Sequence, residues 1–150
     1  MDNYQPKTIV ELQNWMKANC YNFESYAING NIIYEGCGIE KTDGGFTWYY
    51  TERGQKSSLA NFQIEADVVA HAFNEIKSDK WAKAHCIGFT ENIEEHKALT
   101  VILNTMNLKF MQDKIPYYSS GEITYRTFVF GCDVNKTIHL KEKYFSIRSR

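Results

Sequence analysis

The chain has 150 residues, of which 43% are hydrophobic and 15% are aromatic, and its 17 basic and 18 acidic residues give a formal net charge of -1. This length supports one hydrophobic core and is small for two, so we expect a single domain over residues 1–150. A net charge near zero excludes a global field that would attract nucleic acid or an anionic membrane. No run approaches the roughly 20 apolar residues that span a bilayer, and the first residues lack the basic and apolar regions of an export signal, so we expect a cytoplasmic protein.

The first part of the chain predicts a helix and then a hairpin. Thr8 and Glu11 have the spacing of a capping box, and the apolar residues that follow recur at helical spacing. Asn29-Gly30 then separates two apolar runs, 21–28 and 32–37. Asn-Gly between such runs is typical of a tight hairpin turn, so we expect two antiparallel strands here.

The segment 45–62 has the strongest strand pattern in the chain and follows a second reversal at residues 43–45. It predicts an aromatic hairpin that turns at residues 52–55, where Gly54 supplies the permissive backbone. Successive side chains of a strand point to opposite faces, which separates Trp48 from Tyr49. We expect one face to belong to the core and Tyr49 to be available to a protein partner beside the charged turn.

The second half of the chain alternates between helical and strand-like patterns. It predicts, in order, a helix over residues 65–85, a strand over 85–89, a helix over 92–107, and strands over 108–111, 123–134 and 138–147, with a loop that begins at Pro116. Together these elements predict an α+β fold, with a mostly antiparallel sheet and about three helices packed on it.

The four cysteines are scattered along the chain and form neither a CxxC pair nor a dense framework; they are Cys20, Cys37, Cys86 and Cys132. Small secreted domains that depend on disulfides carry closer spacings. We therefore expect all four to be reduced, structural thiols.

Candidate catalytic groups are few. His71 and Glu75 stand four apart in a predicted helix and could share one metal ion, but a catalytic zinc site needs about three protein ligands, and His85 lies across an uncertain helix end. His85 and Cys86 are adjacent in a predicted strand, so they point to opposite faces and form no activated pair with each other. A small hydrolase or nuclease that uses His71, His85 or Cys86 is the alternative that these residues leave open.

Motifs that bind cofactors are absent from the sequence. It contains no GxxxxGK[ST], no GxGxxG before a helix, no GxSxG and no HExxH. The basic residues near the C-terminus are few, and few aromatic residues lie among them. This pattern is typical of a solvated edge strand and not of a nucleic-acid site. We expect no cofactor, no metal, no catalytic residue, no nucleic-acid partner and no membrane partner.

Tyrosines beside carboxylates are the surface feature that favours a protein partner. Aromatic side chains supply buried contact area, and carboxylates steer a basic partner. The loop after Pro116 is stiffened by that proline and has two tyrosines between acidic residues. The predicted partner-binding residues are Asp113, Tyr117, Tyr118 and Glu122 in the segment 113–122, with Tyr49 and Glu52 as a second patch.

Four segments carry a resemblance to a known family: residues 48–54 (WYYTERG), 79–85 (DKWAKAH), 113–117 (DKIPY) and 128–133 (FVFGCD). Together they resemble the small bacterial immunity proteins that are encoded beside polymorphic toxins, including those of contact-dependent growth inhibition. The resemblance implies a cytosolic, non-catalytic protein that binds one cognate toxin domain, often a nuclease, and blocks its active site or substrate surface. A scaffold or adaptor domain with a constitutive partner is a further alternative.

Overall fold

The computed structural model describes residues 4–116 and 123–145. The fold is α+β with mostly antiparallel strands, as predicted. The chain divides into two compact units, Met1–Lys83 and Ala84–Arg150, and each has its own sheet and its own hydrophobic core. The single domain over residues 1–150 stays a prediction.

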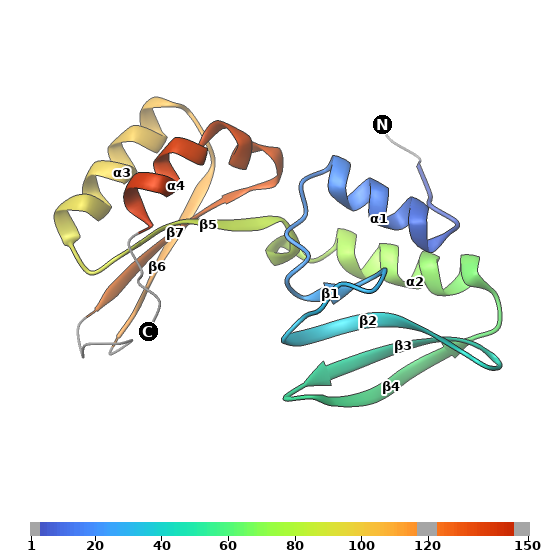
Figure 1. Ribbon diagram of the computed structural model, residues 1–150. Coiled ribbons are helices and arrows are strands. Elements are labelled where there is room, and N and C mark those ends of the chain that lie inside the picture. The colour runs from blue at the N-terminus through green and yellow to red at the C-terminus, as the bar shows by residue number, and fades with distance from the viewer. Residues whose placement is uncertain (1–3, 117–122, 146–150) are drawn as a thin grey trace. The chain divides into compact units, whose positions relative to one another are not determined.

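The first unit is a four-stranded sheet with two helices on one side (Figure 1). The strand order is β1-β2-β3-β4; β2, β3 and β4 are antiparallel neighbours, and β1 is parallel to β2. The elements are α1 (Ile9–Ala18), β1 (Tyr26–Ala27), β2 (Glu35–Thr42), β3 (Gly45–Glu52), β4 (Gln55–Phe62), α2 (Glu65–Lys77) and a 3-10 turn, Lys80–Lys83.

Helix α1 begins as the sequence predicts. The Thr8 hydroxyl accepts a hydrogen bond from the Glu11 amide at 3.1 Å, and the Glu11 carboxylate accepts one from the Thr8 amide at 3.3 Å. A second carboxylate reaches this helix end from α2, because the Ile9 amide donates to Glu65 Oε2 at 2.8 Å. Since the first amides of a helix have no acceptor within it, these bonds satisfy donors that would otherwise need water.

The two reversals after β2 are confirmed. Strands β2 and β3 are joined through residues 43 and 44, and β3 and β4 through Arg53-Gly54. Both Arg53 (φ 53°) and Gly54 (φ 79°) lie in the left-handed region. Two positive φ angles in a two-residue loop match the twist of the flanking strands, which makes this connection tight.

The hairpin predicted around Asn29-Gly30 is wrong. Strand β1 is two residues long and parallel to β2, and residues 28–34 form a loop. The physical reason is Asn31, whose side-chain oxygen accepts from the Ile28 amide at 3.0 Å and whose amide group donates to the carbonyls of Phe23 and Tyr26 at 3.3 and 2.8 Å. These bonds satisfy backbone groups that a hairpin ladder would have used.

The core of the first unit lies between the sheet and the two helices. Its largest fully buried side chain is Trp48 of β3, which packs with Leu12 and Met16 of α1 and with Val68 and Val69 of α2. One face of β3, that of Trp48, thus belongs to the core, as predicted.

The second unit is a three-stranded antiparallel sheet of order β5-β7-β6, with two helices beside it (Figure 1). Its elements are β5 (Ala84–Thr90), α3 (Ile93–Thr105), β6 (Phe110–Ile115), β7 (Thr124–Phe130), a 3-10 segment, Gly131–Lys136, and α4 (Ile138–Tyr144). Its core is formed by Ile87, Leu99, Leu103, Val129, Leu140 and Tyr144.

The strand predicted over residues 138–147 is wrong, because residues 138–144 form α4. The two buried side chains of this segment, Leu140 and Tyr144, are four residues apart, which is helical spacing. Strand β7 also ends earlier than predicted, at Phe130, and the chain then leaves the sheet at Gly131, which has a positive φ of 61°.

Candidate protein-binding surface

Asp113 is held in a cross-strand ion pair. It lies on β6 opposite Arg126 of β7, whose Nε donates to Asp113 Oδ1 at 2.8 Å and whose Nη2 donates to Oδ2 at 2.6 Å. The guanidinium also stacks over the Phe128 ring, 4.9 Å from its centroid. The hydrogen bond to Asp113 raises the pKa of Arg126. Each carboxylate oxygen of Asp113 therefore accepts a hydrogen bond within the protein, and the role of Asp113 toward a partner stays a prediction.

Three of the predicted partner-binding residues, Tyr117, Tyr118 and Glu122, lie outside the described residues. Their part in binding stays a prediction.

Tyr49 does not face solvent at the hairpin tip, and that expectation is wrong. Its side chain is 7% exposed, and it lies in the interior of β3, away from the turn at Arg53-Gly54. Lys56 Nζ of β4 lies 4.6 Å from the ring centroid and forms an ion pair with Glu40 of β2 at 3.0 Å. The ion pair thus joins the strands on either side of β3, and its lysine covers the tyrosine.

Glu52 is exposed at the end of β3 and lies opposite a second carboxylate. The register of β2 and β3 pairs it directly with Glu35. The hydroxyl of Tyr50 donates to Glu35 Oε2 at 3.2 Å. Desolvation and the Glu35 and Glu52 carboxylates raise the pKa of Tyr50, which therefore stays a neutral donor at physiological pH.

Two exposed apolar side chains precede Glu35, and neither is among the residues predicted from the sequence to bind a partner. Ile32 is 96% exposed and Tyr34 is 84% exposed, at the end of the loop that Asn31 organises. A signal was present, because Ile32, Ile33 and Tyr34 are consecutive and a strand cannot bury three consecutive side chains on one face. Large apolar side chains at such exposure mark a contact surface when they are grouped.

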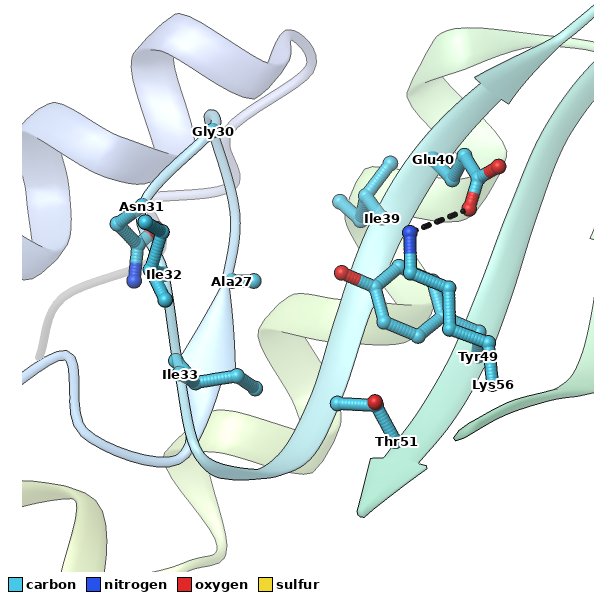
Figure 2. A pocket seen from close by; sticks show the side chains of 10 residues that line it. All are labelled: Ala27, Gly30, Asn31, Ile32, Ile33, Ile39, Glu40, Tyr49, Thr51 and Lys56. Carbon is cyan, nitrogen blue, oxygen red and sulfur yellow. Dashed lines mark hydrogen bonds and ion pairs between the residues drawn. The ribbon is translucent and has the colours of Figure 1, made fainter. Parts of the chain in front are cut away.

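A hollow of about 350 Å³ separates this loop from the sheet (Figure 2). Ile33 lines it from the loop, and Tyr49, Thr51 and Lys56 line it from β3 and β4. The hollow provides a recess beside the exposed Ile32.

Two of the candidate catalytic residues, His71 and Cys86, contact neighbours within their own units. His71 Nε2 lies 4.0 Å from Glu75 Oε1, and the His71 ring packs edge-on against Trp48 with centroids 5.6 Å apart. Cys86 donates from Sγ to the Gly88 carbonyl at 3.3 Å, and burial raises its pKa, so its thiol is protonated near neutral pH. Within the part of the chain that the structure describes, no three His, Cys, Asp or Glu side chains are grouped to hold a metal ion.

The prediction of four reduced cysteines is wrong for two of them. Cys37 and Cys86 are free thiols, whereas Cys20 and Cys132 are disulfide-bonded. The spacing of cysteines along a sequence does not by itself exclude disulfide bonds, because the geometry of the fold decides which thiols can react.

No protein-family model, no curated protein and no solved structure matches this chain. None of the helices in residues 4–116 and 123–145 has the length and apolar character needed to cross a bilayer.

Proposed function

We propose that this chain is a cytoplasmic immunity protein that binds a cognate bacterial toxin domain, such as a nuclease, and neutralises it by stoichiometric protein–protein binding. The observation that carries the proposal is the pair of exposed apolar side chains, Ile32 and Tyr34, of which Ile32 also lines the recess beside the loop. A few aromatic and aliphatic side chains near recesses commonly contribute most of the binding energy at protein interfaces. Exposing grouped apolar side chains to water is unfavourable for an isolated domain, so such groups often mark a contact surface.

The resemblance of four segments to immunity proteins supports the same function. Against the alternative of a thiol-dependent hydrolase, burial raises the pKa of the Cys86 thiol. A thiol-dependent hydrolase would need a thiolate and a positioned base.

The test is co-expression with the toxin domain encoded by the neighbouring gene. Cells that express the toxin domain alone should stop growing, and cells that also express this chain should grow normally. Purified toxin domain and purified chain should form a one-to-one complex in analytical ultracentrifugation. A toxin domain from an unrelated system is the control, and it should be neither bound nor neutralised. Full toxicity in the presence of this chain, with no complex, would exclude the proposal.

A second measurement addresses the compartment. Fractionation of the native host should recover the chain with cytoplasmic markers. Recovery with periplasmic or secreted markers would contradict the cytoplasmic part of the proposal and would agree with the disulfide-bonded state of Cys20 and Cys132.

A further inference from the structure

The pairing of Glu35 with Glu52 is unfavourable in the isolated protein. Residues directly opposite in an antiparallel pair have neighbouring side chains, and two like charges in this position destabilise the sheet. Neither carboxylate forms an ion pair with a lysine or arginine among residues 4–116 and 123–145, and Arg53, the next residue after Glu52, forms none either. The Tyr50 hydroxyl bonds Glu35 but brings no positive charge.

Further negative charge lies on the same unit. Burial raises the pKa of Cys37 on β2, and the negative charge of Glu75 on α2 raises it further. Glu75 itself has His71 at 4.0 Å. The end of β2 and β3 thus carries two carboxylates, Glu35 and Glu52, and one guanidinium, Arg53, and the exposed Ile32 and Tyr34 precede Glu35 in the chain.

This chemistry selects among possible partners. Phosphates of a nucleic acid would be repelled by the two carboxylates. A second copy of this chain, docked through the same patch about a twofold axis, would place Glu35 and Glu52 against themselves. A basic protein surface would relieve the repulsion, because one lysine or arginine between the two carboxylates replaces a like-charge contact with two attractive ones.

We propose that the end of the sheet formed by Ile32, Tyr34, Glu35, Tyr50 and Glu52, here called the Glu35–Glu52 face, binds a basic protein surface. A lysine or arginine of the partner lies between Glu35 and Glu52, and Ile32 and Tyr34 pack against apolar groups around it. The inference rests on the proposed function for the identity of the partner, the toxin domain, but the chemistry of the face is independent of it.

The first experiment needs no toxin. A peptide of alternating arginine and leucine is titrated into the ¹⁵N-labelled chain, and amide shifts are followed by NMR. The largest shifts should fall at residues 32–35 and 50–53, and Glu35→Gln/Glu52→Gln should remove them. Largest shifts at another acidic segment, such as residues 91–95, or shifts unchanged in the double variant, would overturn the inference.

The second experiment measures affinity for the toxin domain by calorimetry. Glu52→Gln and Ile32→Ala should each weaken the complex roughly 30-fold, the loss expected at an interface hot spot. The matched controls are Glu142→Gln, an exposed carboxylate on α4, and Val101→Ala, an exposed apolar residue on α3, and both should bind as wild type. Association with the wild type should slow as salt is added, and less so with Glu52→Gln.

A stability measurement separates a binding role from a structural one. Because Glu52→Gln removes a like-charge contact, its Tm should be unchanged or higher than that of the wild type while its binding is weaker. A lower Tm would mean that the carboxylate stabilises the fold, and the inference would fail. If Glu52→Gln and Ile32→Ala bind the toxin domain with wild-type affinity, the Glu35–Glu52 face is rejected but the proposed function stands. If the wild type forms no complex, the proposed function is rejected, and the peptide titration alone tests the face.

Discussion

Tyr49 of β3 fills the space that a side chain on Gly38 of β2 would need. The two residues are cross-strand partners, and a Cβ built on Gly38 would stand 2.5 Å from the Tyr49 hydroxyl oxygen and 2.7 Å from the carbonyl oxygen of Ala27. A tyrosine ring that packs over a cross-strand glycine contacts the backbone directly and shields the hydrogen bonds between the two strands from water. The absence of a side chain at residue 38 is what allows Tyr49 to be buried on the face opposite Trp48.

Gly38→Ala should therefore destabilise the protein by about 2 kcal/mol, the usual cost of adding a methyl group to a packed site. The added carbon meets a backbone carbonyl, which cannot rotate away as a side chain would. Gly44→Ala is the matched control, since a Cβ there meets nothing within 4 Å. Urea unfolding of both variants measures the difference, and equal midpoints would show that the Tyr49 packing adapts.

The Asp113–Arg126 pair should couple β6 and β7. In a double-mutant cycle of Asp113→Asn and Arg126→Gln, we expect a coupling energy of about 0.5–1 kcal/mol, because the geometry is bidentate but the two side chains are 36% and 33% exposed and so screened by water. The coupling should shrink in high salt. Additive effects of the two substitutions on the unfolding free energy would show that the pair contributes nothing.

His96 should make the stability depend on pH. Desolvation lowers its pKa below the usual value of about 6.5, and its ring stacks on Tyr125 with centroids 4.8 Å apart. As the pH falls through about 6.5, His96 takes up a proton in the unfolded chain before it does so in the folded chain. The free energy of unfolding therefore decreases between that pH and the lower pKa of His96 in the folded chain, and below that pKa this effect is complete.

The measurement is the Tm of wild type and His96→Gln between pH 7.5 and pH 5, a range chosen to bracket about 6.5. The wild type should lose more stability over this range than the variant does. Parallel pH profiles would show that His96 titrates alike in the folded and unfolded chains.

The thiol count distinguishes the two cysteine states directly. Protein unfolded without reductant should react with two equivalents of a thiol reagent, at Cys37 and Cys86, and with four after reduction. Cys37→Ser is the control and should lower the first count to one. Four reactive thiols before reduction would restore the expectation drawn from the sequence.

The sequence predicted best where the determinants are local. The Thr8 cap and the Arg53-Gly54 turn depend on residues within four positions of one another, and both were predicted correctly. It failed at residues 28–34 because the three bonds of the Asn31 side chain compete with a hairpin ladder, and the Asn-Gly signal contains no information about them. It failed at α4 because Leu140 and Tyr144 fit both an alternating and a helical pattern.

Part of the Glu35–Glu52 face could be predicted from the sequence. Once residues 43 and 44 are taken as a two-residue turn, the register of β2 and β3 follows, and it places Glu35 opposite Glu52. The exposure of Ile32 and Tyr34 could not be predicted, because it depends on the loop that the Asn31 side chain organises. The burial of Tyr49 was missed for a similar reason, since it depends on a glycine in one neighbouring strand and on a lysine in the other.

The hydrogen bond from the Ile9 amide to Glu65 has a consequence for how the chain opens. An amide in the first turn of a helix ordinarily exchanges its proton with water as fast as the helix end frays. At Ile9 the acceptor belongs to α2, so the proton is released only when the starts of α1 and α2 separate. Deuterium uptake at this one amide therefore follows the opening of the helical layer as a whole, and slow uptake so near the beginning of the chain would identify α1 and α2 as one cooperative unit.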